Sequence, residues 1–332
     1  MKTAIVQPSP GIGDFLWLVP HIRALVAHLG TPVTLVAKPA TLADQTLHGD
    51  SAIREVIWLD RNPKDRRGMA DGLAGLLRMV KVLRAKGFDA VYLLHHSPRL
   101  ALMLWLAGIP RRYGYGLGLQ RLFLNRHPFL PAADQRLCSI AKAGKWLMLF
   151  GIPLPDEAEP RLTIDQALSE TVCRRLVPPY LVFGIGASTP FKQWSAERFA
   201  GLIEGLLSAG WGSVVLVGGA KEQAMAGEIR NRLPELAARI VTALGWHLAE
   251  VVALCGHAGF YVGNDTGALN IAAAAGTKAY GIFGASSPLT HSRRIVGVVP
   301  KGGMDTVSGM AAISCADVLS VIEADRGGLT PH

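Results

Sequence analysis

The stretch GFYVGNDTGALNIAAAAG, residues 259–276, decides how this sequence folds. Its apolar start, Phe260 to Val262, predicts a short strand, and the small residues from Ala268 onward predict a helix. A tight polar turn, residues 263–267, joins the two. Such a turn leaves free backbone N–H groups at the start of the helix, where the helix dipole also favours negative charge. The stretch therefore predicts a binding place for an anion such as phosphate.

The polar turn can be interpreted in two ways. Asp265 and Thr266 place a carboxylate and a hydroxyl beside the anion site. Alternatively, one of these side chains caps the helix and the glycines only allow the chain to turn. For an isolated turn the capping role is the commoner one, because turns rich in Gly and Asp occur wherever a chain reverses. The rest of the sequence favours the anion site.

Length and composition indicate a globular protein with two domains. The chain has 332 residues, of which half are hydrophobic and 18% are charged. Its four cysteines are scattered without a CxxC pair, which argues against a zinc site or a disulfide framework and suits a reducing cytoplasm. The N-terminus lacks the long apolar run of a signal peptide, and the apolar stretch 100–109 is too short to span a bilayer. We expect a soluble, cytoplasmic protein.

The net charge of +9 indicates an acidic partner. The basic residues are spread along the chain, with no Lys/Arg run and no aromatic–basic motif of the kind that binds nucleic acid. A phosphorylated or carboxylated substrate, or an anionic membrane surface, remains. Nucleic acid is not expected.

Strands and helices alternate through both halves of the sequence. In the first half, strand 3–6 leads through a Gly-rich turn into an amphipathic helix, and periodicity predicts further helices over 69–86 and 134–150. In the second half, strand 180–183 and its Gly-rich turn repeat the arrangement. This alternation predicts two parallel-sheet α/β domains facing each other across a cleft. The stretch 151–160, rich in proline and acidic residues, is the best linker.

Asp14 follows the first Gly-rich turn, at the carboxyl edge of the first predicted strand. It can serve simply as a negative charge at the start of a helix. It can also serve as a catalytic base, because ligands of open α/β sheets lie outside the carboxyl ends of the strands.

Four segments together resemble glycosyltransferase family 9, the heptosyltransferases of lipopolysaccharide core assembly. They are GIGD at 11–14, GASTPFKQWSAERF at 186–199, VGGAKE at 217–222 and GNDTGALNIAAAAGTKAYGIFG at 263–284. The resemblance implies a GT-B fold of two Rossmann-like domains, with an acceptor domain at 1–165 and a nucleotide-sugar domain at 166–332. The last helix can pack back on the first domain in this arrangement. The resemblance also implies inverting, metal-independent transfer with no cofactor besides the co-substrate, ADP-heptose.

The resemblance also assigns roles to residues. Asp14 is the expected general base on the acceptor hydroxyl, and Lys192 is expected to neutralise the donor diphosphate. Ser188 would donate a hydroxyl to a phosphate, and Glu222 would hold the ribose hydroxyls. The complete expected donor set is Ser188, Glu222, Asp265, Thr266, Gly267 and Ala268. One departure concerns the family's frequent histidine, whose place Asn270 takes here; asparagine cannot become a cation, so the donor sugar or its binding can differ.

Elementary chemistry agrees with these roles. Transfer from a nucleoside diphosphate sugar builds negative charge on the leaving diphosphate. Without a metal, this charge has to be met by a lysine, hydroxyls and helix N–H groups. The acceptor hydroxyl needs a carboxylate nearby to take its proton. Lys192, Ser188 and the turn at 265–268 supply the first set, and Asp14 is the candidate for the second.

The expected acceptor is an anionic glycolipid that carries phosphate and carboxylate groups. Arginine binds such groups with a two-pronged fork, so basic residues near strand ends are candidates. The expected acceptor residues are Gly13, Arg99, Arg111 and Arg112, together with the basic run 61–67. For each arginine the alternative is a solvated surface charge.

We therefore expect a cytoplasmic heptosyltransferase that acts on a lipopolysaccharide inner-core sugar. The basic balance also allows peripheral contact with the inner membrane. Two alternatives stay open: a GT-B transferase that uses another nucleotide sugar or a protein acceptor, and a non-catalytic nucleotide-binding protein on the same scaffold.

Overall fold

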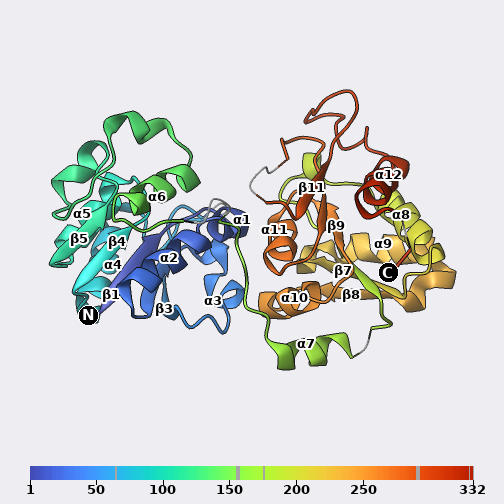
Figure 1. Ribbon diagram of the computed structural model, residues 1–332, viewed down its shortest axis with the longest axis horizontal. Coiled ribbons are helices and arrows are strands. Elements are labelled where there is room, and N and C mark those ends of the chain that lie inside the picture. Colours follow the sequence, from blue (N-terminus) through green and yellow to red (C-terminus); the bar gives the residue numbers. More distant parts are fainter. Residues whose placement is uncertain (64–65, 155–157, 175, 289–291, 329, 332) are drawn as a thin grey trace. The chain divides into compact units, whose positions relative to one another are not determined.

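The structure is a computed structural model that describes residues 1–63, 66–154, 158–174, 176–288, 292–328 and 330–331. The chain forms two compact units, Met1–Pro160 and Arg161–His332, and each contains one parallel sheet covered by helices (Figure 1). The predicted fold class of two parallel-sheet α/β domains is confirmed. The sequence analysis placed the division at residue 165, and which domain takes which substrate stays a prediction.

The first unit is built on a five-stranded sheet with the order β3-β2-β1-β4-β5, in which all paired strands are parallel. Strands β1, β2 and β4 are wholly buried, as expected for strands covered by helices on both faces. The strands are β1 (Thr3–Gln7), β2 (Val33–Ala37), β3 (Ile53–Trp58), β4 (Ala90–Leu93) and β5 (Arg111–Gly114).

The helices of the first unit follow the apolar periodicity of the sequence. In α4, for example, Leu76, Met79, Val80 and Leu83 enter the core, and the helix ends at Gly87 in the left-handed conformation. The helix predicted over 134–150 is shorter, because a 3₁₀ turn, η3, precedes it. The elements are α1 (Ile12–Leu16), α2 (Val19–Leu29), η1 (Pro39–Thr41), α3 (Ala43–Thr46), α4 (Gly72–Lys86), α5 (Pro98–Leu106), η2 (Gly118–Leu122), η3 (Ala132–Arg136) and α6 (Ser139–Met148).

The second unit has a six-stranded parallel sheet with the order β11-β10-β9-β6-β7-β8. The edge strand β11 was not predicted, because it has only four residues and no clear alternation. The strands are β6 (Tyr180–Gly184), β7 (Ser213–Gly218), β8 (Ile240–Leu244), β9 (Tyr261–Asn264), β10 (Ala279–Ile282) and β11 (Ile295–Val298).

Helices and 3₁₀ turns connect these strands, and α12 at the end of the chain packs against α8 and β11 of its own unit. The core between them is rich in aromatic rings; Trp194 and Phe199, for example, meet edge to face with centroids 5.0 Å apart. The elements are α7 (Gln166–Cys173), η4 (Pro190–Lys192), α8 (Ala196–Ser208), η5 (Ala220–Glu222), α9 (Gln223–Arg232), η6 (Pro234–Arg239), α10 (Leu248–Cys255), α11 (Gly267–Ala274) and α12 (Cys315–Arg326).

Two glycines allow the central strands β6 and β9 to pair closely. Gly184 and Gly263 lie side by side in the register, and the ring of Tyr261 lies over both. A Cβ atom on Gly184 would be 1.6 Å from the Tyr261 hydroxyl, and one on Gly263 would be 2.6 Å from the Gly184 carbonyl oxygen. Larger residues therefore cannot occupy these two positions. The close pairing of β6 and β9 brings together the turns that follow these strands.

One segment, Ile12–Leu29, is long and apolar enough to cross a membrane by length and composition. Half of its window is buried inside the protein, and the described structure divides it into α1 and α2. Core helices of soluble proteins meet the same criterion, so the finding is weak support for a membrane span.

Candidate active site

Three turns begin side by side at the carboxyl edge of the second sheet, that is, where its parallel strands have their C-terminal ends. Gly184 at the end of β6 is beside Gly263, and Asn264 at the end of β9 is beside Ile282 at the end of β10. The segments that follow these strands therefore leave the sheet side by side. In open parallel sheets, this edge is where ligands bind.

Lys192, Asp265 and Ser286 meet at this edge. The Lys192 ammonium lies 2.5 Å from Oδ2 of Asp265, and the Ser286 hydroxyl donates to the same oxygen over 2.7 Å. The residue at the start of α11 is Thr266, but its side chain makes no capping hydrogen bond. Asp265 is thus engaged by a lysine and a hydroxyl. The structure brings the predicted Lys192 and Asp265 together and adds Ser286, which the sequence analysis missed.

Asn264 connects the turns behind this cluster. Its side chain is fully buried; the amide oxygen accepts from the backbone N–H of Trp194 over 3.2 Å, and the amide nitrogen donates to the Gly186 carbonyl over 3.0 Å. Trp194 is itself anchored, because its indole N–H donates to the Ile313 carbonyl over 2.9 Å. One side chain therefore fixes both the loop that carries Lys192 and the turn after β6. This second residue was also missed.

A small pocket of about 210 Å³ lies next to the cluster, between the turns after β6 and β7. Glu222 is buried in its wall, and among the described residues its Oε2 atom has no hydrogen-bond partner. The buried hydroxyl of Thr189 also lacks one within that part of the chain. The pocket is lined by Ala187, Ser188, Thr189, Pro190, Gln193, Lys221 and Glu222. The pocket thus contains two of the residues predicted to bind the donor. Ser188 is exposed, and the Glu222 carboxylate can accept hydrogen bonds from hydroxyl groups.

Three further residues of the α11 turn are accounted for. Gly267 and Ala268 occupy its first turn and are half-buried, so their backbone N–H groups are the ones a helix leaves unpaired. Asn270 is buried, and its amide donates to the Thr266 carbonyl over 3.0 Å. This contact occupies part of the Asn270 side chain within the helix.

In the first unit, Asp14 lies in the first turn of α1, just past the carboxyl end of β1. Gly13 precedes it, and Gly11, whose backbone is extended, is the cap residue directly before the helix. The Asp14 side chain is accessible to solvent, but partial desolvation raises its pKa above the ordinary 3.8. A carboxylate with a raised pKa is a better proton acceptor.

Cationic side chains follow the neighbouring strands at the same edge. Lys38 directly follows β2, and Arg61 lies a few residues after β3. Within the described part of the chain, neither side chain makes an ion pair or a hydrogen bond. Burial lowers the pKa of Arg61, and the charge of Arg99 lowers it further. Burial likewise lowers the pKa of Lys38, with a smaller effect from Arg61. Arg61 is therefore close enough to repel both Lys38 and Arg99, and the Asp71 carboxylate offsets part of this repulsion.

Arg99 completes this cationic cluster, and a neutral histidine lies beside it. His95 follows β4, and burial lowers its pKa to about 4, with smaller effects from His96 and Lys38. Arg99, in the first turn of α5, donates to the Gly72 carbonyl, which fixes its guanidinium at this edge. Lys38 and His95 were not predicted as site residues, although each lies just after a strand.

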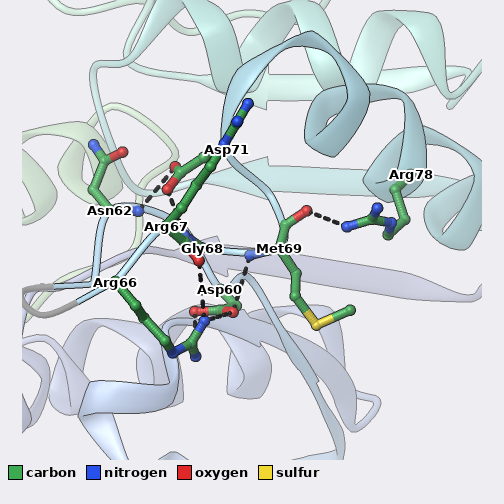
Figure 2. Close-up of polar contacts among 8 residues, drawn as sticks. All are labelled: Asp60, Asn62, Arg66, Arg67, Gly68, Met69, Asp71 and Arg78. Carbon is green, nitrogen blue, oxygen red and sulfur yellow. Dashed lines mark hydrogen bonds and ion pairs between the residues drawn. The ribbon is translucent and has the colours of Figure 1, made fainter.

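The basic run 61–67 is held by two acidic residues (Figure 2). Asp60 accepts from both terminal nitrogens of Arg66 over 2.8 and 3.1 Å and from the Met69 N–H over 3.0 Å. Asp71 accepts from the backbone N–H groups of Asn62 and Gly68 over 3.0 and 2.7 Å. Arg66 is therefore committed to the loop itself, whereas Arg61 stays available. Residues 64–65 of the run lie outside the described residues.

Arg111 and Arg112 lie at the amino ends of the strands of the first sheet, opposite to the carboxyl ends where Asp14 and Arg99 lie. They begin β5, where Arg111 pairs with Ala90, whereas the carboxyl end of this strand is Gly114. The Arg112 guanidinium donates to the carbonyls of Phe123 and Ile109 over 2.7 and 2.5 Å. The structure therefore does not bring these two arginines together with Asp14 and Arg99.

Metal-binding side chains do not gather anywhere in the described ranges. No group of three or more His, Cys, Asp or Glu residues there could hold a metal ion. The four cysteines are all free.

Comparisons with known proteins agree with this architecture. A family model described as "Glycosyltransferase family 9 (heptosyltransferase)" matches residues 76–299. The chain is 28% identical over 324 residues to lipopolysaccharide heptosyltransferase 2 of Salmonella typhimurium, covering 90% of this chain and 88% of that protein. It superposes on the ADP-heptose lipopolysaccharide heptosyltransferase II structure of Escherichia coli with a TM-score of 0.76 and 25% identity, covering 98% of both chains. The Escherichia coli heptosyltransferase WaaC with ADP-2-deoxy-2-fluoro heptose, at 20% identity and a TM-score of 0.70 over 98% of this chain and 100% of that one, shares the fold.

Proposed function

This chain belongs to glycosyltransferase family 9 and is a glycosyltransferase, and we propose that it transfers a heptose from ADP-heptose to an inner-core sugar of lipopolysaccharide. The observation that carries the proposal is the cluster of Lys192, Asp265 and Ser286 beside the start of α11. It is suited to a leaving diphosphate, and it lies in a chain that matches heptosyltransferase 2 over most of its length.

On the donor side, the proposed work is electrostatic. The leaving ADP gains negative charge as the bond to the anomeric carbon breaks, and Lys192 meets that charge together with the first N–H groups of α11. The Ser188 hydroxyl donates to a phosphate oxygen. Glu222 holds the ribose hydroxyls in the adjacent pocket, which would give its unpartnered oxygen donors. Asp265, Thr266, Gly267 and Ala268 contact the diphosphate and the sugar.

On the acceptor side, Asp14 takes the proton from the attacking hydroxyl. Partial desolvation raises the pKa of Asp14, which makes its carboxylate a stronger base toward the hydroxyl proton. One carboxylate acting as base, with no second one acting as nucleophile, gives a single displacement with inversion at the anomeric carbon. Metal-independent transfer is part of the proposal and is tested by activity in excess EDTA.

The proposed acceptor is anionic, and the cationic edge of the first sheet supports this. Arg61 is repelled by Lys38 and by Arg99, and the Asp71 carboxylate offsets only part of this positive charge, so phosphate or carboxylate groups of a glycolipid core would be attracted there. Arg111 and Arg112 were expected in this role, but their place at the other edge favours Lys38 and Arg61 instead. Gly13, directly before Asp14, stays in the proposed acceptor set. We place the enzyme in the cytoplasm, meeting its glycolipid at the inner membrane.

The decisive experiment combines ADP-heptose with lipopolysaccharide cores truncated before each heptose. We expect ADP release matched by one added heptose in the mass spectrum of one core, and neither with the Asp14→Asn variant. If no core accepts heptose while another nucleotide sugar supports transfer, the donor assignment is wrong.

The second candidate is a transferase of the same fold with another donor sugar. Asn270, which replaces a histidine of the family and donates to the Thr266 carbonyl, favours testing it. A thermal-shift comparison of ADP-, UDP- and GDP-sugars separates the two, because a ligand stabilises the folded protein in proportion to its affinity.

A further inference from the structure

A group of exposed apolar side chains lies on the first unit, outside the candidate active site. Trp105 near the end of α5 is 50% exposed, and Leu119 and Leu122 of η2 are 67% and 72% exposed. We call these three residues the α5–η2 patch. Large exposed apolar side chains that gather in one place mark interaction sites on soluble proteins.

Local geometry keeps the patch together. Residues three apart eclipse in a 3₁₀ helix, so Leu119 and Leu122 point the same way. The intervening Gln120 is fully buried; its side chain donates to the His95 carbonyl and accepts from the Gly116 N–H over 2.6 and 2.8 Å. This buried amide fixes η2 against the sheet, so its leucines must face solvent.

The tryptophan belongs to the same surface because η2 packs along α5. The ring of Trp105 lies 6.1 Å from that of Phe123, the residue that directly follows Leu122. The Gln120 bond to His95 also places one end of η2 next to the carboxyl edge of the first sheet, close to the cationic cluster.

The segment that carries the patch contains charged residues of one sign only. Residues 90–133 contain five arginines and no aspartate, glutamate or lysine. Arg121 and Arg126 are exposed beside the two leucines in sequence, and the Arg121 guanidinium lies 5.1 Å from the centre of the Phe129 ring. The segment that carries the patch therefore supplies exposed arginines and no carboxylate, which favours attraction to an anionic surface.

We propose that the α5–η2 patch seats the protein on an anionic lipid bilayer. Trp and Leu side chains enter the boundary between headgroups and acyl chains, and arginines bind the phosphates above them. Charge complementarity selects this partner, because the rim matches acidic headgroups. A second copy of the chain would set the same arginines against each other.

Bilayer binding can be measured without donor or acceptor, by co-sedimentation with vesicles. With equal parts of phosphatidylglycerol and phosphatidylcholine we expect binding, and with phosphatidylcholine alone we expect at least about tenfold less. The double substitution Leu119→Ser with Leu122→Ser should reduce binding to the anionic vesicles about tenfold or more, because two anchors are lost. The matched control is Val177→Ser with Val307→Ser, which removes two exposed apolar residues of the second unit and should leave binding unchanged.

A third variant tests the rim. Arg121→Ala with Arg126→Ala should weaken binding and flatten its dependence on salt. Equal binding by the leucine variant and its control would overturn the proposal, as would binding to phosphatidylcholine alone at full strength. Concentration-dependent self-association that the serine pair abolishes would instead make the patch a protein interface. Transfer to a soluble truncated core should stay unchanged in the leucine variant, so failure of the bilayer proposal is distinguishable from failure of the proposed reaction.

Discussion

The ammonium of Lys192 lies 2.5 Å from a carboxylate oxygen of Asp265, although the two residues are 73 positions apart in the chain. The lysine proposed to stabilise the leaving diphosphate is therefore already partly neutralised. A bound diphosphate has to share it with Asp265. This competition sets the first two predictions.

Replacing Lys192 with alanine removes the positive charge that meets the leaving group. We expect kcat/KM for heptose transfer to fall by roughly 10²–10³, in line with the loss of one preorganised electrostatic contact. Lys278→Ala is the matched control, since Lys278 also pairs with a carboxylate, Asp325, but precedes β10 at the other edge of the sheet. Steady-state kinetics would contradict the role of Lys192 if the two variants lost similar activity.

Replacing Asp265 with asparagine should separate binding of the nucleotide from turnover. Without the carboxylate, Lys192 is free to face the diphosphate, so the affinity for ADP should rise by a few-fold. Transfer should become slower, because the proposed contact of Asp265 with the sugar is weakened. Calorimetric titration with ADP, alongside kinetics, checks both directions; weaker ADP binding would contradict the competition between Asp265 and the diphosphate for Lys192.

Asp14→Asn should lower the transfer rate by about 10²–10⁴ while ADP binding stays intact. In the unmodified enzyme, kcat/KM should fall as pH drops through the raised pKa of Asp14, because the base becomes protonated. Desolvation favours the neutral acid, so ionisation of Asp14 lowers the stability of the folded protein as pH rises through this pKa. The asparagine variant should therefore melt at a slightly higher temperature at neutral pH. Asp44→Asn, another exposed acid in the first turn of a helix, is the control. A near-normal rate in Asp14→Asn would remove the base assignment.

His21 should make the first unit sensitive to acid. It is buried in α2, and burial lowers its pKa from 6.5 to about 4. Because the folded state favours the neutral ring, stability is full above pH 6.5 and is lost as pH falls towards 4, by on the order of 3 kcal/mol. His21→Leu should flatten this loss in urea unfolding measured at both pH values, while His28→Gln, at the exposed end of the same helix, should not. His95 shares the direction of the effect, so part of the dependence should remain.

Much of this architecture could be predicted from local sequence. Apolar runs that end in Gly-rich turns predicted the central strands. Lys192 and Asp265 each follow one of these strands, as in the family pattern. Contacts that depend on register between distant strands could not be predicted. Ser286 reaches Asp265 only because β10 lies next to β9, and β11 is too short to show a pattern.

The end of the strand at which a residue lies explains the other differences between the predicted and observed site residues. Arg111 and Arg112 were chosen for their charge, but they open β5 and so fall at the amino edge of the sheet. Lys38 was overlooked because a single lysine after a strand carries no local signal. Its importance appears only where the sheet order brings β2 near β3 and the charge of Arg61.

Asn264 gives the last prediction. Its buried amide joins the Trp194 N–H to the Gly186 carbonyl, and because Trp194 is fully buried its N–H would lose its partner when the side chain is removed. Asn264→Ala should therefore lower the free energy of unfolding by about 2–3 kcal/mol. It should also reduce transfer beyond the loss of folded protein, because the loop that carries Lys192 loses its anchor. Asn264→Asp should do more damage, since a carboxylate would face carbonyl oxygens. Asn231→Ala on the exposed side of α9 serves as the control for urea unfolding and kinetics. An Asn264→Ala variant with normal stability and normal turnover would show that the two turns hold their positions without this side chain.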